Sequence, residues 1–374
     1  MSSLRCSISA LLIVSLLLTG CWDRRELDER SLITAVALDT APEGYKLSFM
    51  IPIPIKIAGS GGGGTGEGGQ DVVQIFSSTG TTISEAFGKI RREVNQEPFF
   101  GYTVLLLLGE DVLQTGIEKD LDVFRRYPQM RRRLIPAVVK GRADEVLHAN
   151  PKLEQIPSNY IYLLLDNGIS QGWMADVTLG DLFANLSDPS RNGVVNMLDI
   201  KNDVVRWIGL AVLKGDRMVG RLSDVESVPA IQLRDQKAGN FIEVPCPGGK
   251  GSFVFRALRV NPKVKIDNKE KIRIKSTVHV IGEIIENGCK NNLSDQKELV
   301  KFSSSVKKLY EQVARNLLHK MQKELKSDIF FYGERIRALH PQLWREIDWK
   351  TTFPKVKVEV EYQVEIRRYG MESR

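Results

Sequence analysis

Residues 294–328, SDQKELVKFSSSVKKLYEQVARNLLHKMQKELKSD, carry the most regular hydrophobic pattern in the chain. Its apolar side chains recur every three or four residues, at Leu299, Phe302, Val306, Leu309, Val313, Leu317, Met321 and Leu325. This spacing predicts one long amphipathic helix, because successive turns place these side chains on one face. We expect this face to lie across a sheet, since a helix with one apolar stripe needs a partner layer.

The sequence around this helix predicts that sheet. Residues 251–260, 271–286 and 355–368 alternate apolar and charged side chains, the last as KVKVEVEYQVEIRR. A period of two is typical of strands with one buried and one solvated face. Further strands are expected at 194–200, 205–214 and 218–222. The pattern predicts a C-terminal antiparallel sheet packed by one long amphipathic helix.

The preceding part of the chain has a different organisation. Expected strands at 31–40, 45–57, 71–79, 102–108 and 134–140 are interspersed with expected helices at 82–95, 110–127 and 142–148. This order predicts an α/β layer with at least partly parallel pairing. Residues 153–193 favour helices, which either complete this domain or form a bridging lobe. The turn-forming cluster from Asp188 to Gly193 marks the expected boundary.

The chain as a whole is therefore expected to have a multi-domain, mixed α/β (α+β) fold. A length of 374 residues exceeds what one hydrophobic core usually supports. We expect an N-terminal domain over residues 21–193 and a C-terminal domain over residues 194–374. The tract Gly59–Gly69 lacks the Gly-Lys-Ser/Thr ending of a phosphate loop, and is interpreted as a surface connection.

The N-terminal residues predict lipid anchoring. Residues 8–18 are apolar except for two serines, but they would give only roughly 16 Å of helix, about half of a bilayer core. The following Leu18-Thr19-Gly20-Cys21 resembles a bacterial lipobox. We expect residues 1–20 to be a lipoprotein signal peptide and Cys21 to carry a diacylglyceryl group. The alternative is an ordinary signal peptide with an incidental cysteine.

Composition narrows the range of partners. The formal charge is +7 and the basic residues are spread along the chain, with small clusters at Arg125–Arg126 and Arg131–Arg133. These clusters lack the interleaved aromatic residues of single-strand nucleic-acid binders. Nucleic acid is therefore not expected. A basic surface can face anionic lipid headgroups or simply be solvated.

Two of the four cysteines remain after processing and acylation, namely Cys246 and Cys289. In an exported protein such a pair can form a disulfide. The sequence leaves open whether the pair is bridged.

The sequence contains no recognisable catalytic, metal or cofactor motif. The four histidines are far apart and lack companions with metal-ligand spacing. A nucleophile elbow, a Walker sequence and a dinucleotide fingerprint are also missing. We therefore expect no catalytic residues, no metal and no cofactor, and interpret the chain as a binding or assembly module and not an enzyme.

Several motifs resemble those of one family. The run Cys21-Trp22-Asp23-Arg24-Arg25-Glu26-Leu27, followed by a strand ending at Asp39, is similar to the opening of the Ger(x)C spore germination lipoproteins. Similar C-terminal motifs are Asp328–Glu334, His340–Trp344, Trp349, Phe353–Val356 and Ile366–Arg368. Gly209–Val212 also fits. The resemblance runs from Cys21 to the C-terminus.

This resemblance implies the C subunit of a nutrient germinant receptor. Such a subunit is anchored on the outer surface of the inner spore membrane, beside two integral membrane subunits, A and B. It also implies a multi-domain mixed α/β fold and no known catalytic activity. It assigns no nutrient pocket.

Two other functions stay open at this point. The chain could be an exported solute-binding lipoprotein that presents a small molecule to a membrane complex. A cell-envelope hydrolase is disfavoured by the missing motifs.

Overall fold

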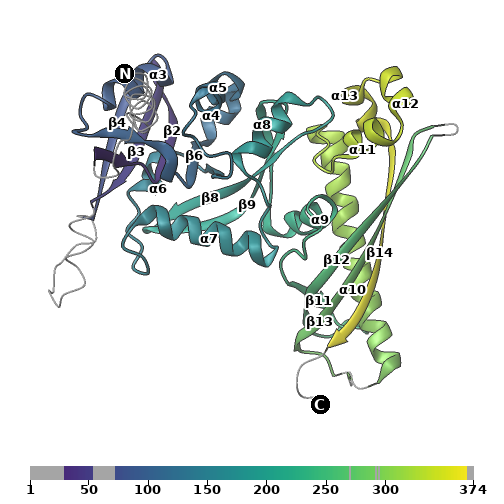
Figure 1. Ribbon diagram of the computed structural model, residues 1–374. Helices are drawn as coiled ribbons and strands as arrows, with labels where there is room; N and C mark the ends of the chain where they lie inside the picture. Colours follow the sequence, from purple (N-terminus) through teal and green to yellow (C-terminus); the bar gives the residue numbers. More distant parts are fainter. Residues whose placement is uncertain (1–28, 54–71, 269–270, 291–292, 294, 369–374) are drawn as a thin grey trace, which may run out of the picture.

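The computed structural model describes residues 29–53, 72–268, 271–290, 293 and 295–368. Cys21 and the glycine tract, on which two of the expectations rest, lie outside the described residues. The described chain builds two main sheets with helices on their faces (Figure 1). The expected mixed α/β fold, with a C-terminal sheet packed by one long helix, is confirmed.

The larger sheet has eight strands in the order β10-β9-β8-β7-β6-β2-β3-β4. The central neighbours β2, β6, β7 and β8 pair in parallel, and the outer neighbours pair antiparallel. The strands are β2 (Ala35–Ala41), β3 (Gly44–Pro52), β4 (Val73–Gly80), β6 (Leu105–Gly109), β7 (Ile135–Val139), β8 (Val194–Lys201), β9 (Val204–Lys214) and β10 (Arg217–Leu222).

Helices cover both faces of this sheet, so its central strands are apolar on both sides. Leu106 and Leu108 face the core beneath α3, α4, α5 and α8, whereas Leu105 and Leu107 face α6 and α7. The helices are α3 (Ile83–Ile90), α4 (Glu110–Thr115), α5 (Glu118–Arg126), α6 (Ala143–Leu147), α7 (Pro157–Gln171) and α8 (Leu179–Ser187). A parallel two-stranded sheet pairs β1 (Arg30–Leu32) with β5 (Glu97–Phe99), which leads into η3 (Phe100–Tyr102).

The sequence predicted one helix over 110–127, and this prediction is wrong. Gly116 has a φ of 103°, a conformation that glycine adopts readily and that breaks the helix into α4 and α5.

The eight-stranded sheet continues across the boundary expected after residue 193. β8, β9 and β10 follow that boundary in sequence but join the sheet of residues 35–139. The helices of residues 153–193 also belong to this layer, with α7 and α8 on opposite faces (Figure 1). The sheet thus includes the first strands of the expected C-terminal domain.

The second sheet has the order β11-β12-β13-β14. Its strands are β11 (Ile242–Pro245), β12 (Ser252–Asp267), β13 (Arg273–Asn287) and β14 (Lys357–Arg368). The first three pair antiparallel as expected, but β14 pairs in parallel with β13. The reason is the long connection before β14, which contains α10 (Gln296–His319) and returns the chain to the same end of the sheet.

The long helix packs on this sheet with a slightly different face from the predicted one. Tyr310 and Ala314 are buried in the core, where Tyr310 stacks on Tyr362 with ring centroids 5.0 Å apart. Leu309 and Val313, predicted as part of the stripe, are only partly buried. The helix continues as a π-helical segment, η4 (Lys320–Leu325), and ends at Lys326, whose φ is 52°.

The remaining helices lie in the C-terminal region, where some of them contact the larger sheet. They are α9 (Asp224–Arg234), α11 (Tyr332–Leu339), α12 (Pro341–Glu346), α13 (Trp349–Thr352) and η5 (Phe353–Lys355). One continuous core joins Val194, Leu210 and Val212 of the larger sheet to Phe302 and Tyr362 of the C-terminal layer.

Candidate functional site at the joint between the two sheets

A buried carboxylate organises the chain directly after the long helix. The side chain of Asp328 is nearly fully buried and accepts backbone N–H bonds from Phe330 at 3.1 Å and Gly333 at 2.8 Å. It also accepts the indole N–H of Trp349 at 2.9 Å. Burial raises the pKa of Asp328 to about 6, against the opposing effect of these donors. The carboxylate thus joins the start of α11 to α13.

A second group of charged side chains links this region to the expected boundary segment. The guanidinium of Arg337, on α11, lies 2.7 Å from Asp188 Oδ2. Arg191 forms an ion pair with Glu334 and stands over the Phe331 ring, 5.4 Å from its centroid. Burial by itself would raise the pKa of Asp188. Hydrogen bonds from Ser190 and the charge of Arg337 outweigh this effect, so the pKa is lowered. The boundary segment is therefore fixed against α11.

Further bonds attach the end of the long helix to the larger sheet. Lys320 donates to the Arg221 carbonyl oxygen and to Glu226 Oε1, both at 2.8 Å. The Ser327 hydroxyl donates to the Leu213 carbonyl oxygen at 2.6 Å. We call the contacts of residues 188–192, 213–226 and 320–355 the joint. The joint is a packed interface with many hydrogen bonds.

The N-terminal motif strand β2 also carries a buried carboxylate, Asp39, one residue after its parallel pairing with β6 ends. Asp39 caps α6 by accepting the N–H groups of Ala143 at 2.6 Å and Asp144 at 2.9 Å. Burial raises the pKa of Asp39 to about 6, and the adjacent Asp144 carboxylate adds to this. A Cβ on Gly109 would lie 2.4 Å from Asp39 Oδ1, so this close approach requires glycine. The Asp39 side chain therefore has a structural role at the ends of the parallel strands.

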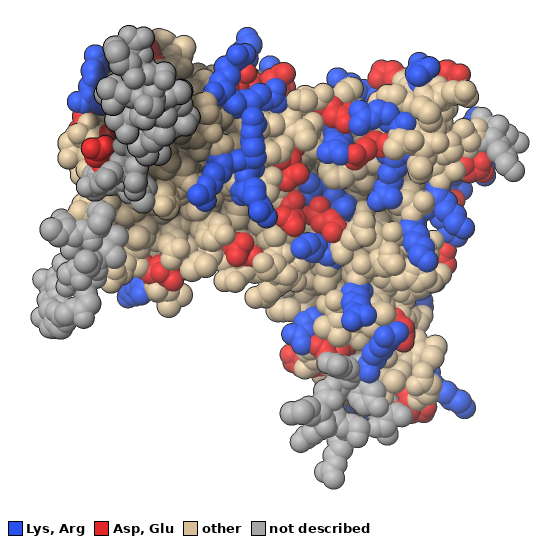
Figure 2. Space-filling model, viewed as in Figure 1, with Lys and Arg blue, Asp and Glu red and all other residues tan. Residues whose placement is uncertain are grey.

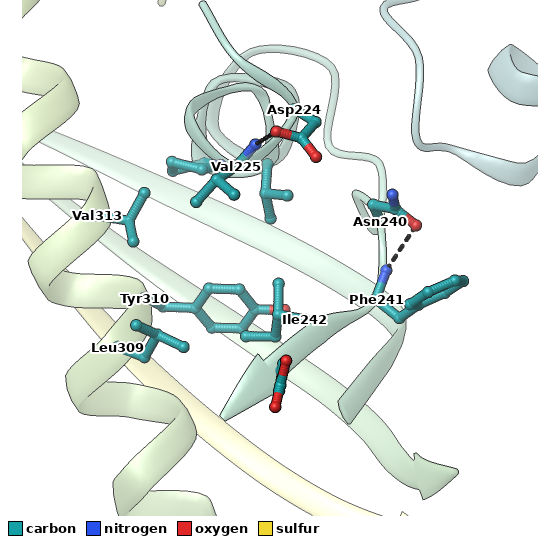
Figure 3. Close-up of a pocket in the computed structure, with 11 residues that line it drawn as sticks. Asp224, Val225, Asn240, Phe241, Ile242, Leu309, Tyr310 and Val313 are labelled. Carbon is teal, nitrogen blue, oxygen red and sulfur yellow. Dashed lines mark hydrogen bonds between the residues drawn. The ribbon is translucent and has the colours of Figure 1, made fainter. Parts of the chain in front are cut away.

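An apolar groove lies beside the long helix, between α9, β11 and α10 (Figure 3). Its volume is about 230 Å³, and Leu309 and Val313 line it, which explains their partial exposure. Phe241 and Val225 border the groove, and each residue is more than half exposed.

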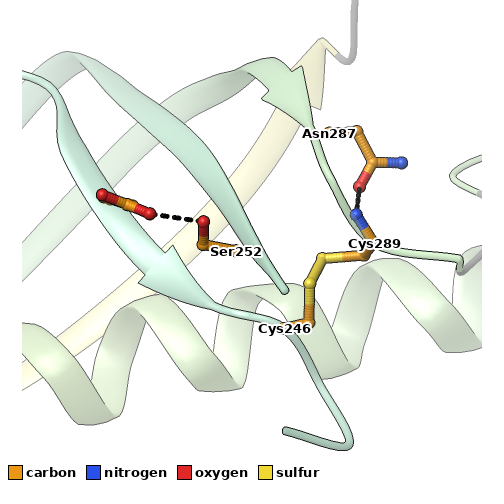
Figure 4. Close-up of a disulfide and its surroundings, with 5 residues drawn as sticks. Cys246, Ser252, Asn287 and Cys289 are labelled. Carbon is orange, nitrogen blue, oxygen red and sulfur yellow. Dashed lines mark hydrogen bonds between the residues drawn. A yellow bond between two sulfur atoms is a disulfide. The ribbon is translucent and has the colours of Figure 1, made fainter. Parts of the chain in front are cut away.

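Cys246 and Cys289 lie at the same end of the C-terminal sheet. The structure joins them as a disulfide with Cα atoms 5.7 Å apart, a usual separation for a bridge (Figure 4). Asn287 supports this turn by accepting the Cys289 N–H at 3.0 Å. The bridge connects the residue after β11 to the second residue after β13 and closes a 43-residue separation.

The other predicted site residue, Cys21, lies outside the described residues, so its acylation stays a prediction. Within the described ranges, no three His, Cys, Asp or Glu side chains are arranged to hold a metal. Sequence reasoning found the motif Asp328–Glu334 but assigned it no role. The signal available was an aspartate directly after a long helix, followed by a glycine five residues on.

The fold and the joint define a class of protein, namely a mixed α/β protein with two main sheets. Residues of the motif Asp328–Glu334 take part in the joint between these sheets. Residues 23–200 match the family described as spore germination protein N-terminal domain. Residues 208–370 match the family described as spore germination B3/GerAC like, C-terminal. The chain belongs to this family of spore germination proteins.

Full-length relatives agree with this assignment. Spore germination protein KC of Bacillus subtilis is 27% identical, over 99% of this chain and 97% of its own length. The putative spore germination protein YfkR of the same species is 25% identical, over 96% and 95%. GerQC of Bacillus cereus is 22% identical, over 96% and 98%. Neither matching family is described as enzymatic.

A solved structure has the same fold. The crystal structure of the GerBC protein superposes with a TM-score of 0.59 at 17% identity, covering 88% of this chain and 96% of that one. Among the described helices of the present chain, none combines the length and the apolar character needed to cross a bilayer.

Proposed function

We propose that this protein is the lipid-anchored C subunit of a spore nutrient germinant receptor. In this role it is noncatalytic and acts by assembly with the integral membrane subunits A and B. The observation that carries the proposal is the match of both germination domains over residues 23–200 and 208–370. The expected acylation site, Cys21, comes two residues before the first matched position.

Lipid anchoring supplies the physical basis for assembly. A diacylglyceryl group provides two acyl chains, which meet the two-signal requirement for stable membrane attachment. An anchored domain meets membrane partners at high effective concentration, so modest contacts suffice for a stable complex. The anchor would hold the folded domains on the outer surface of the inner spore membrane.

The decisive experiment replaces Cys21 by alanine in the full chain. We expect Cys21→Ala to abolish incorporation of labelled fatty acid, to release the protein from the spore membrane fraction and to impair nutrient-triggered germination. Cys6→Ala is the matched control, because it removes a thiol from the signal peptide only. Immunoblots of whole spores separate mislocalisation from loss of the protein. Normal membrane retention and normal germination of Cys21→Ala would refute the anchoring mechanism.

Crosslinking in the same membranes tests the partnership. We expect adducts with integral membrane proteins from the wild-type chain and from Cys6→Ala. These adducts should be depleted in Cys21→Ala. Equal adduct yields in all three strains would show that assembly does not depend on the anchor.

A solute-binding lipoprotein is the second candidate, and the apolar groove beside α10 favours it. Leu309→Trp would fill this groove while leaving the buried Tyr310 in place. A saturable rise in melting temperature with amino acids or sugars, lost in Leu309→Trp, would support this function over a purely assembling one.

A further inference from the structure

Five exposed arginines gather on the N-terminal part of the molecule. Arg125 and Arg126 end α5, and Arg131, Arg132 and Arg133 lie in the segment that leads to β7. We call these five residues the arginine face. Figure 2 shows basic side chains crowded over this part of the molecule, in the region of α4 and α5.

Aromatic rings hold several of these guanidinium groups without neutralising them. Arg125 and Arg132 both stand over the ring of Phe183, at 4.9 Å and 4.6 Å from its centroid. Arg131 stands over Tyr102 at 5.8 Å. Cation–π contacts of this kind orient a guanidinium and leave its charge intact.

Carboxylates neutralise only a small part of this charge. Arg126 pairs with Asp122 at 2.6 Å. Among the residues that the structure describes, the other four arginines of the face have no carboxylate within 4.0 Å. Further acidic groups line the neighbouring hollows: Glu118, the first residue of α5, shares one with Arg125 and Arg126. Asp166 and Asp176 share another with Arg131 and Arg133. Asp176 is partly engaged by Lys237 at 3.6 Å. The face thus keeps a net positive charge.

The arginine face adjoins the point where the described chain begins. Arg30, in β1, stands over Phe99 at 4.4 Å, and Phe99 contacts Tyr102 with ring centroids 6.2 Å apart. Tyr102 in turn lies under Arg131. Three successive contacts therefore connect the first described strand to the face.

The length of chain between the anchor and β1 limits how far Arg30, the first residue of β1, can lie from the bilayer. Nine residue steps separate Cys21 from Arg30, and a fully extended chain spans at most about 3.3–3.6 Å per residue. The reach is therefore at most about 32 Å. An acylated Cys21 therefore keeps Arg30 within this distance of the lipid headgroups, and the arginine face lies beyond Arg30 along the contacts through Phe99 and Tyr102.

We infer that the arginine face rests on an anionic lipid surface and sets the orientation of the protein on the membrane. This inference rests on the proposed lipid anchor only for the distance argument, since the charge and its aromatic supports are properties of the described residues. Tyr102 is 43% exposed beside Arg131, and an aromatic ring at the headgroup level suits such a surface. Each arginine near an anionic surface strengthens binding by about fivefold.

Vesicle cosedimentation of a non-acylated chain tests the surface separately from the anchor. The chain from residue 21 onward, carrying Cys21→Ser, contains both matched domains. We expect it to bind vesicles of phosphatidylcholine with 30% phosphatidylglycerol, and to bind pure phosphatidylcholine far more weakly. The triple variant Arg131→Gln, Arg132→Gln, Arg133→Gln should lose on the order of 100-fold in affinity. Raising the salt concentration should weaken wild-type binding.

A matched control removes the same charge elsewhere. Lys263→Gln, Lys265→Gln and Lys308→Gln change three exposed lysines of the C-terminal sheet and α10, and binding should fall by less than about fivefold. A variant with lysine at positions 131, 132 and 133 keeps the charge and should retain most of the vesicle binding. Thermal unfolding of each variant shows whether it is folded. Equal loss in the lysine control, or anionic binding unchanged in the arginine variant, would overturn the inference.

The outcomes separate this inference from the proposed function. Release of Cys21→Ala from spore membranes washed at high salt tests the anchor only, because salt weakens binding through the arginines. The vesicle assay tests the arginine face only, because the protein used there carries no acyl group. Conversely, a lipidated Arg131–Arg133 variant should stay in the membrane fraction but expose Tyr102 and its surroundings to soluble protease or labelling reagents. Unchanged labelling of this lipidated variant would count against an orienting role for the face.

Discussion

The buried carboxylate of Asp328 provides the sharpest test of the joint. Asp328→Ala removes the acceptor of three N–H groups, those of Phe330, Gly333 and the Trp349 indole. A buried donor left without an acceptor costs about 1–3 kcal/mol, so we expect this variant to lose at least about 3 kcal/mol of unfolding free energy. Such a loss is a large fraction of the stability of a typical domain.

Asp328→Asn refines the test because it keeps the side-chain shape. Its oxygen can take the position of Oδ2, which accepts both Gly333 and Trp349, while its NH₂ group faces the Phe330 N–H. One unpaired donor remains, so we expect a loss of about 1–3 kcal/mol. Urea unfolding followed by circular dichroism measures both variants. Asp203→Asn, at an exposed turn, is the matched control and should change stability by less than about 0.5 kcal/mol.

The pH dependence gives an independent check on the same residue. The pKa of Asp328 is raised from 3.8 to about 6 in the folded protein, so folding favours its protonated form. The corresponding stabilisation is complete below about pH 4 and is lost as the pH rises through 6. The advantage of wild type over Asp328→Asn should therefore be about 1 kcal/mol larger at pH 5 than at pH 7. An alanine variant within 1 kcal/mol of wild type, or an advantage that grows with pH, would refute this account of the joint.

Two further predictions concern the C-terminal region. Cys246 and Cys289 should be bridged: in the chain from residue 21 onward with Cys21→Ser, alkylation of the unfolded protein should add mass only after reduction. Replacing both cysteines by alanine should cost about 4 kcal/mol for a 43-residue separation. Equal masses with and without reductant would exclude the bridge. Gly333→Ala should cost about 1–3 kcal/mol by thermal or urea unfolding, because its Cβ would lie 2.4 Å from Trp349 Nε1. Gly88→Ala, with open space around the new Cβ, should be neutral or stabilising, and equal costs would contradict the steric argument.

The sequence by itself determined the local elements and the family. The long helix at 294–328 followed from its spacing of apolar residues, and the strands at 251–260, 271–286 and 355–368 followed from strict alternation. These periodicities are properties of neighbouring residues, so no distant contact is needed to read them. The motifs from Cys21 to the C-terminus likewise sufficed to identify the family, which the domain matches confirm.

Only the tertiary structure decided which strands pair and what the motif residues do. Strands 194–222 join the larger sheet and not the C-terminal one, and β14 pairs in parallel with β13. Alternation within a strand cannot distinguish these possibilities, because a strand buries the same apolar face whichever neighbour it has. The same limit applies to Asp328 and to the arginine face. Their roles depend on groups far away in the sequence, Trp349 for one and Phe183 and Tyr102 for the other, which only folding brings together.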